Sequence, residues 1–403
     1  MSKSTSNRPV PSTIPAPRLV QNGGEFAEMM AFLQDQPLIS VDTESDSLYR
    51  YHPRVCLIQI SACVSDAVAQ PSPADPVPTV DYLLDPLKFH RLQPLGELLA
   101  DPAVEVLFHA AENDVRLLDR DFNFRCANVY DTQLAARILG RNGVGLATIL
   151  QDEFGVISDK SMQRTDWGRR PLTAQQMTYA QIDTHYLPVI RQRQIAKLKE
   201  ADRWEEALEG FAALAALRYE EPAQERTFWR MKQTREIDRA DLGLLEELWS
   251  WREITAERTD RPPFKVLGDT VLGELTQHKP SSLAELSEIN GFNDRQVSRM
   301  GREVLEAVRL GQTRPTPTFP EPTVRPEQLL SNKERARYDA LRQWRTEVLT
   351  ERGVDPDIVF NNDTLLQIAT KQPDSVEALQ EIAAIGPWKA KTYGAAVLAI
   401  ANR

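Results

Sequence analysis

Short apolar runs alternate with helical patterns over the first 150 residues. Four of the runs, LISV (38–41), VCLIQIS (55–61), DYLLD (81–85) and EVLFHA (105–110), and a shorter fifth, NVYD (128–131), predict strands of a largely buried sheet. Helical patterns lie between and after them, at 25–34, 113–120 and 132–139. This alternation predicts an α/β domain with a mixed or parallel sheet. The proline-rich segment 69–78 is expected to form an exposed loop between two strands.

Another helix is predicted to begin at Thr173. Thr173 and Gln176 have the spacing of a capping box, in which each side chain bonds the other residue's backbone N–H. Tyr179 and Asp183 are four residues apart, so they share one face of this helix. Pro188 is expected to bend or end it.

Beyond residue 235 the strand patterns stop and the chain becomes helical, with an internal repeat of about 93 residues. The matched positions are Trp251-Arg252 with Trp344-Arg345, Pro280 with Pro373, Leu286 with Leu379, and, one residue out of register, Asp269-Thr270 with Asp363-Thr364. A proline-rich linker, 311–327, joins the two copies and is typical of a semi-rigid spacer. We therefore expect two small helical domains.

Length and composition limit the number of domains and the class of protein. A chain of 403 residues suggests about three domains. No apolar run approaches the roughly 18 residues of a membrane helix, so no membrane association is expected. The first residues have no signal-peptide pattern and are expected to be a flexible tail. Three scattered cysteines exclude a disulfide framework or a zinc site. We expect a cytoplasmic, monomeric protein.

The net charge of −10 argues against a protein that coats nucleic acid through bulk positive charge. The charge is unevenly distributed along the chain. Segment 155–203 carries nine Lys and Arg residues against five Asp and Glu, whereas segment 236–311 carries ten against fifteen. Segment 330–403 is balanced. A polyanion contact is therefore expected first in segment 155–203.

Acidic residues follow several of these elements. Asp42 and Glu44 end the strand at 38–41 and point to the same side, and Asp114 follows the strand at 105–110. Asp183 lies on one helix face with Tyr179. Each has an ordinary alternative: solvated loop acids, a helix N-terminal acid that complements the dipole, or a surface residue. Four acids and a tyrosine in this order and setting are harder to explain as coincidence.

These motifs carry a family resemblance. The order DTE (42–44), FHAAENDV (108–115) and YAQID (179–183) resembles the DEDD exonuclease superfamily, in the subclass with tyrosine in its last motif. Segment 159–172, DKSMQRTDWGRRPL, looks like the segment that marks ribonuclease D and its relatives. The helical repeats resemble HRDC domains. Ser45, where many ribonuclease D sequences have an aromatic residue, is closer to the exosome-associated relatives.

The resemblance implies an α/β ribonuclease H-like exonuclease domain followed by two small all-α domains. The implied divisions are a tail at 1–17, an exonuclease domain at 18–215, a connector with the first HRDC domain at 216–311, a linker at 312–329 and a second HRDC domain at 330–403.

The resemblance also implies hydrolysis at RNA 3′ ends with two divalent ions, Mg²⁺ or Mn²⁺, releasing 5′-mononucleotides. Asp42 would bridge both ions, Glu44 and Asp183 would bind the first, and Asp114 would serve the second through water. Tyr179 would orient the attacking water. Four crowded carboxylates agree with this, because bare anions at such distances would repel one another.

Substrate contacts are expected from residues that can bind phosphate, stack a base or hold the scissile end. They are His109, Lys160, Arg164, Trp167, Arg170, Lys389 and Lys391. Core packing is the alternative for Trp167 and His109, and surface charge is the alternative for the cations. The turn at 385–388, followed by Lys389 and Lys391, is expected to present backbone N–H groups to phosphate. The turn at 289–292 could do the same, but the first repeat is acidic, which favours the alternative for either repeat, a packing or protein-docking module.

The leading functional hypothesis is a 3′→5′ exoribonuclease that trims structured RNA such as tRNA precursors. A DNA 3′→5′ exonuclease is a second enzyme hypothesis, although the chain carries no P-loop or polymerase motif. A non-catalytic RNA-binding scaffold is a third. The presence of all four acids favours an enzyme.

Overall fold

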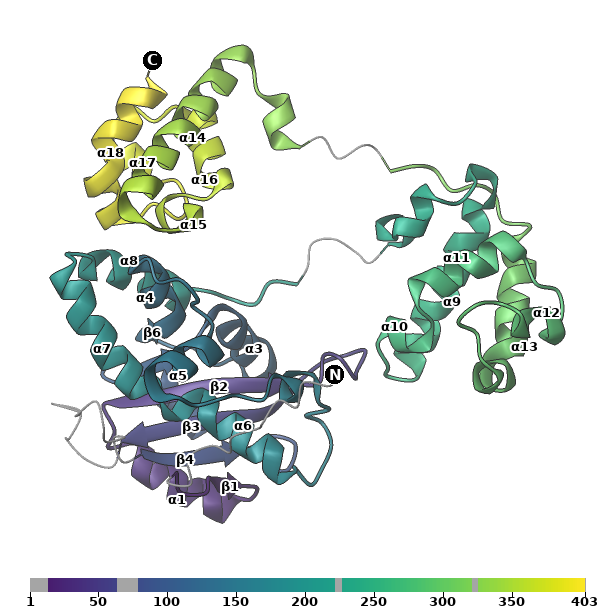
Figure 1. Ribbon diagram of the computed structural model, residues 1–403, viewed down its shortest axis with the longest axis horizontal. Coiled ribbons are helices and arrows are strands. Elements are labelled where there is room, and N and C mark those ends of the chain that lie inside the picture. Colours follow the sequence, from purple (N-terminus) through teal and green to yellow (C-terminus); the bar gives the residue numbers. More distant parts are fainter. Residues whose placement is uncertain (1–13, 64–78, 222–226, 321–324, 403) are drawn as a thin grey trace, which may run out of the picture. The chain divides into compact units, whose positions relative to one another are not determined.

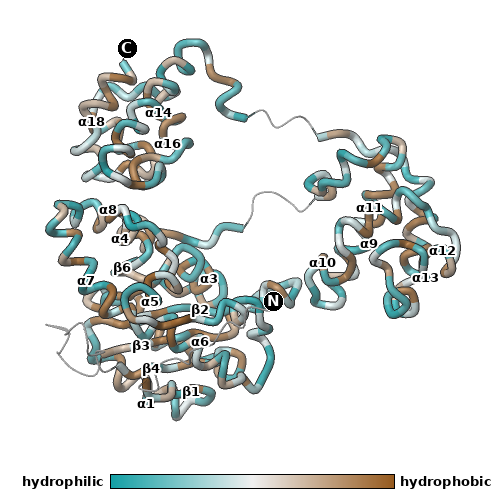
Figure 2. The backbone as a smooth tube through the Cα atoms, viewed as in Figure 1, coloured by the Kyte–Doolittle hydropathy of each residue, from teal (hydrophilic) through white to brown (hydrophobic). Residues whose placement is uncertain are grey.

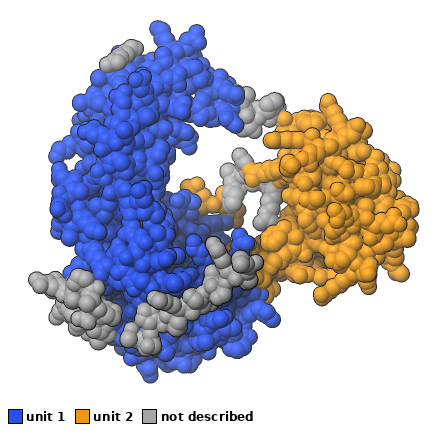
Figure 3. Space-filling model, viewed as in Figure 1, with its two compact units in different colours: residues 1–45, 55–219, 324–403 blue, residues 46–54, 220–323 orange. Residues whose placement is uncertain are grey.

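The computed structural model describes residues 14–63, 79–221, 227–320 and 325–402. They form two compact units (Figure 3). Unit 1 comprises residues 1–45, 55–219 and 324–403, and unit 2 comprises residues 46–54 and 220–323. Most of the predicted tail and the predicted loop at 69–78 lie outside the described residues.

A six-stranded mixed sheet forms the centre of the first domain (Figure 1). Its strands are β1 (Arg18–Val20), β2 (Leu38–Ser45), β3 (Val55–Cys63), β4 (Thr79–Leu84), β5 (Glu105–Phe108) and β6 (Val129–Asp131). Their order is β1-β4-β3-β2-β5-β6, with β3 antiparallel to β2 and β4 and the other pairs parallel. The five predicted strands are confirmed. The edge strand β1 was not predicted.

Helices cover both faces of this sheet. They are α1 (Gly23–Leu33), α2 (Gln93–Leu99), α3 (Glu112–Phe122), α4 (Thr132–Ile138), α5 (Leu146–Phe154), η2 (Lys160–Arg164), α6 (Ala174–His185), α7 (Leu187–Glu200) and α8 (Trp204–Ala215). One core joins α1, α2 and α3 to one face through Phe26, Leu95 and Val115. On the other face α6 packs over β2, β3 and β4. Figure 2 shows the hydrophobic segments along the central strands, and the predicted α/β class is confirmed.

The predicted boundaries of α6 are confirmed. Thr173 caps its N-terminus in a capping box with Gln176. The helix ends at His185, and Pro188 lies in the first turn of α7, where its missing N–H costs no hydrogen bond. Pro188 thus lies in the first turn of the following helix and breaks neither helix.

The rest of the chain is helical, as predicted. Unit 2 contains η3 (Phe228–Arg230), η4 (Lys232–Arg235), η5 (Arg239–Asp241), α9 (Leu242–Arg258), α10 (Pro263–Val266), α11 (Asp269–His278), α12 (Leu283–Ser287) and α13 (Asp294–Gly311). The second repeat contains η6 (Pro326–Leu329), α14 (Asn332–Arg352), α15 (Pro356–Val359), α16 (Asn362–Lys371), α17 (Val376–Gln380) and α18 (Pro387–Ala401). None of the helices in the described part of the chain is long and apolar enough to cross a membrane.

Each repeat buries an arginine of its first helix against the start of a later one. Arg252 donates to Asp269 at 2.5 Å, and Arg345 donates to Asn362 at 2.9 Å. Both arginines are nearly inaccessible to solvent. Asp269 therefore corresponds to Asn362, in the same register as the arginines. The expected match of Asp269 with Asp363, one residue out of register, is wrong.

Candidate active site

The end of β2 brings two carboxylates to the surface of the sheet. Asp42 and Glu44 alternate with the buried Thr43. Asp42 pairs with Gln59 of β3, whose side-chain amide donates to Asp42 at 3.0 Å. Pairing with β3 shifts register between Glu44 and Ser45. Such irregularities end regular pairing and re-aim side chains beside active sites.

Asp114 lies in the first turn of α3 and is buried. It accepts hydrogen bonds from the backbone N–H of Thr43 at 3.1 Å and from its hydroxyl at 2.5 Å. The turn before α3 is held by Asp131, which accepts from the N–H groups of Ala110 and Ala111. Asp131 also caps α4. One carboxylate thus fixes the start of two helices.

Helix α6 supplies Tyr179 and Asp183 from one face. The Tyr179 hydroxyl bonds the carboxylate of Asp183 and the side chain of Gln163. Burial and the neighbouring carboxylates raise the pKa of Tyr179 above its usual range. The phenol therefore stays protonated at neutral pH and acts as a hydrogen-bond donor.

The four carboxylates converge. Ligand atoms of Asp42, Glu44 and Asp183 lie within 4.8 Å of one another. Burial, then repulsion from the other three acids, raises the pKa of Asp42 well above its usual range. Burial is also the largest cause that raises the pKa of Glu44 to about 9, of Asp183 to about 8 and of Asp114 to about 7. Without a cation, these groups hold protons at pH values where isolated carboxyls are ionised.

This set of side chains fits divalent cations. Carboxylate oxygens are hard ligands of the kind that Mg²⁺ and Mn²⁺ prefer. A bound cation would favour the ionised form of each carboxyl and offset the repulsion that raises the pKa values. Asp42, Glu44 and Asp183 are near enough to share one ion.

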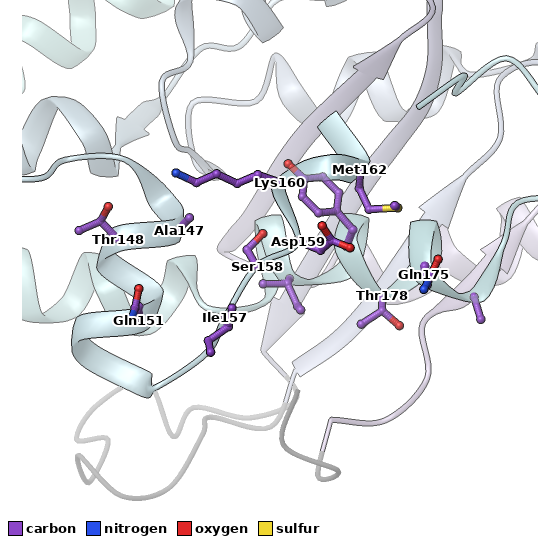
Figure 4. A pocket seen from close by; sticks show the side chains of 13 residues that line it. Ala147, Thr148, Gln151, Ile157, Ser158, Asp159, Lys160, Met162, Gln175 and Thr178 are labelled. Atoms are coloured by element: carbon purple, nitrogen blue, oxygen red, sulfur yellow. The ribbon is translucent and has the colours of Figure 1, made fainter. Parts of the chain in front are cut away.

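An open cleft surrounds the carboxylates. His109, Gln163 and Lys160 line it together with the four acids and Tyr179. Burial lowers the pKa of His109 to about 4, so its ring is neutral at pH 7, and its Nδ1 lies 2.9 Å from the Thr132 hydroxyl. A second pocket, lined by parts of α5, α6 and the segment between them, shares Lys160 and Tyr179 with the cleft (Figure 4).

Comparison with known proteins agrees with this geometry. The family model described as 3′-5′ exonuclease matches residues 17–198, and the HRDC domain model matches residues 241–308 and 334–401. Ribonuclease D of Granulibacter bethesdensis is 28% identical over 97% of this chain and 94% of its own, and that of Jannaschia sp. is 29% identical over 96% and 95%. The chain thus carries a 3′-5′ exonuclease domain and HRDC domains, and over nearly its whole length it is similar to proteins named Ribonuclease D. The predicted class of 3′→5′ exoribonuclease is thereby confirmed.

Solved structures of this ribonuclease D-like architecture are similar in fold. The catalytic core of RRP6 from Trypanosoma brucei aligns with a TM-score of 0.64 at 25% identity, over 74% of this chain and 80% of its own. Escherichia coli RNase D aligns with a TM-score of 0.62 at 22% identity, over 96% and 99%. An exonuclease domain followed by all-α domains is therefore the fold, as predicted.

Two predicted substrate contacts of this ribonuclease D-type chain are wrong. Trp167 is 1% exposed and packs beside Tyr179, with 6.1 Å between ring centroids, so its ring has no face free for a base. The guanidinium of Arg170 bonds the carboxylate of Asp85 at 2.5 and 2.8 Å and the carbonyl of Cys56 at 2.6 Å. Neither side chain lines the cleft.

The prediction that the turn at 385–388 presents free backbone N–H groups to phosphate is also wrong. Glu209 of α8 accepts from the backbone N–H groups of Trp388 at 2.6 Å and Lys389 at 3.4 Å, so these donors are satisfied within the protein. The left-handed residue of this turn is Ala384 (φ 71°), whereas Gly386 is the extended N-cap of α18.

The lysines of this region differ in exposure. The Lys389 ammonium lies 5.7 Å from the ring centroid of Phe360, and burial lowers its pKa. Lys391 is exposed. Contacts of the Lys389 and Lys391 side chains with RNA remain predictions.

Three supporting residues escaped sequence analysis: Thr43, Gln59 and Gln163. Each bonds a member of the cluster. Gln59 carries a signal that could have been read, because it is the one amide side chain in the apolar run VCLIQIS. Thr43 and Gln163 show no such signal, because their partners lie on other elements.

Proposed function

We propose that this protein removes 5′-mononucleotides one at a time from the 3′ ends of structured RNA, such as tRNA precursors, by two-metal hydrolysis. The observation that carries the proposal is the convergence of Asp42, Glu44 and Asp183 to within 4.8 Å, beside Asp114. The relatives named Ribonuclease D support RNA as the substrate. The E. coli neighbour is described as an exoribonuclease involved in structured RNA processing. A monomer acting in the cytoplasm remains the prediction from sequence.

The four carboxylates would share two divalent ions. Asp42, Glu44 and Asp183 would hold one ion, and Asp42, with Asp114 through water, would hold the second. When bound, two such ions polarise the attacking water and neutralise charge on the attacking and leaving oxygens. Asp183 also accepts the Tyr179 hydrogen bond. The phenol would hold the water in line for attack, since its raised pKa makes it a poor base.

The cleft offers neutral and cationic groups to the RNA end. His109 lines it as an uncharged ring that can bond the terminal sugar or phosphate. Lys160 lines the same cleft and is exposed, and Arg164 is exposed on the same short helix, η2. These two cations would contact phosphates, which fix the position of a nucleic acid. Lys391 would add a contact farther along the RNA.

One assay separates the remaining hypotheses. RNA and DNA strands of one sequence, each labelled at the 5′ end, are incubated with Mn²⁺ or Mg²⁺, and products are resolved by size. We expect the labelled RNA to shorten one nucleotide at a time from its 3′ end, and a 3′-phosphate to slow the shortening by adding charge against the carboxylates. Asp183→Asn should be inactive, and Asp35→Asn, which changes an exposed acid of the same domain, should match wild type. Preference for DNA, internal cuts, or RNA binding without cleavage would contradict the proposal.

A further inference from the structure

A buried polar network anchors the inner side of α6 to the sheet. Asp81 of β4 is 4% exposed and lies at its centre. The Gln181 amide donates to one Asp81 oxygen at 2.6 Å, and Nδ1 of His185 lies 2.9 Å from the same oxygen. The Ser61 hydroxyl donates to the other oxygen at 2.6 Å and lies 2.7 Å from the Thr184 hydroxyl. Nothing in the proposed mechanism uses these groups.

The same helix therefore has an anchoring side and a catalytic side. Gln181, Thr184 and His185 have the i, i+3, i+4 spacing of one helix face and are buried against the sheet. Tyr179 and Asp183 line the cleft instead. With side chains about 5–6 Å from the helix axis, a rotation of about 10° would move the Asp183 carboxylate by about 1 Å. A displacement of that size can cost about 100-fold in rate.

Directional bonds can prevent such a rotation where apolar contacts cannot. Hydrophobic packing is non-directional, so it tolerates small rotations of a helix on a sheet. A buried carboxylate that accepts from donors on a neighbouring strand and a helix has one favourable geometry, and leaving a donor unpaired is costly. Fixing register is the best-attested role of such buried polar groups.

We propose that Asp81 is a positioning residue for this nuclease: through Gln181 and His185 it sets the rotation of α6 and so the place of Asp183 and Tyr179 in the site. This inference rests on the proposed function. Asp81 does not touch the cleft, so its removal should lower kcat and the metal response without changing how RNA is held.

The test compares Asp81→Asn and Asp81→Leu with wild type on a short single-stranded RNA at saturating Mn²⁺, well below each variant's melting temperature. We expect kcat to fall about 10-fold in Asp81→Asn and about 100-fold in Asp81→Leu, with KM within about twofold of wild type. The rise in melting temperature on adding Mn²⁺ should shrink in parallel, which reports on the ligand set without catalysis. Asp85→Asn removes another buried carboxylate, which bonds Arg170 and not α6, and should keep wild-type kcat.

A second pair of variants keeps the test decisive if Asp81→Leu does not fold. His185→Asn retains a donor near the Nδ1 position and should keep most of the activity, whereas His185→Leu should resemble the Asp81 variants. Wild-type kcat and Mn²⁺ response in folded Asp81→Asn and His185→Leu would overturn the proposal. So would a change in KM alone, or an equal loss in Asp85→Asn. An inactive wild-type protein would instead contradict the proposed function.

Discussion

Thr43 donates two hydrogen bonds to the carboxylate of Asp114, one from its backbone N–H at 3.1 Å and one from its hydroxyl at 2.5 Å. Thr43 lies between the two acids of β2, and Asp114 belongs to α3. The pair therefore fixes the distance between the strand and the helix that supply the cluster. Bonds of this kind to a charged acceptor contribute about 1.5–3 kcal/mol each.

Replacing the Thr43 hydroxyl tests this link. We expect Thr43→Val, which keeps the shape and the backbone bond, to lower activity at limiting Mn²⁺ about 10-fold, because Asp114 loses its shortest hydrogen bond. Thr43→Ser retains the hydroxyl and should stay within about twofold of wild type. A metal titration of initial rates measures both. Equal rates for Thr43→Val and wild type at every Mn²⁺ concentration would show that the hydroxyl does not position Asp114.

Tyr179 and Asp183 should differ in how strongly their removal affects catalysis. Asp183→Asn removes a charged ligand, so we expect kcat to fall by about 1,000-fold or more. Tyr179→Phe removes only a hydroxyl that orients water, so the loss should be nearer 10- to 100-fold. Single-turnover rates at saturating metal compare them. If Tyr179→Phe lowered kcat as much as Asp183→Asn does, the role of the phenol could not be limited to orienting water.

The crowded carboxyls should make the metal-free protein less stable as pH rises. Their folded-state pKa values lie above the unfolded value near 4, reaching about 7 for Asp114, about 8 for Asp183 and about 9 for Glu44. The folded chain thus binds more protons than the unfolded chain across this window, and its stability falls with pH there. Asp42→Asn removes one charge from the cluster and should melt about 5 °C above wild type at pH 8, with little difference at pH 4.

The measurement is a series of melting curves in EDTA between pH 4 and 9, followed by the same series in Mn²⁺. The metal should remove or reverse the advantage of Asp42→Asn, because only the wild-type chain keeps its full ligand set. A wild-type protein whose metal-free stability rises with pH over this range would contradict the arrangement of charges described above.

The second helical repeat should contribute to the stability of the exonuclease domain. Arg352 of α14 forms a bidentate ion pair with Glu206 of α8. The Glu206 side chain is 2% exposed. Arg352→Met leaves that carboxylate buried and unpaired, which should cost about 3–5 kcal/mol. The double variant with Glu206→Met should recover much of the loss. Arg309→Met, which breaks an exposed pair, is the control and should cost under about 1 kcal/mol. Equal denaturation midpoints for Arg352→Met and Arg309→Met would contradict this role.

Sequence patterns predict most of this fold because local rules and tertiary structure agree here. The apolar runs, the capping box at Thr173 and the N-cap at Asp131 act within a few residues, so their geometry can be read directly. The catalytic set was predicted from motif order and a family resemblance. The structure places Asp183 beside Asp42 and Glu44, although it is far from them in sequence.

The wrong predictions of substrate contacts concern residues whose partners are distant in sequence. Arg170 resembles a phosphate ligand in a basic segment, but it pairs with Asp85, which follows β4. Trp167 looked like a stacking platform, but tertiary packing buries it. The sequence around the N-terminus of α18 predicts free backbone N–H groups, but Glu209 of α8 accepts a hydrogen bond from one of them, that of Trp388. Charge and residue type gave no indication of these partners.

The dependence of RNA hydrolysis on divalent metal tests the central claim most directly. Protein stripped with EDTA is mixed with uniformly labelled RNA while Mn²⁺ is titrated back, and mononucleotide release is followed for wild type and Asp42→Asn. The four-carboxylate site predicts no release in EDTA, full recovery with Mn²⁺ in wild type, and no recovery in Asp42→Asn. Undiminished release in EDTA, or equal recovery in Asp42→Asn, would contradict the account.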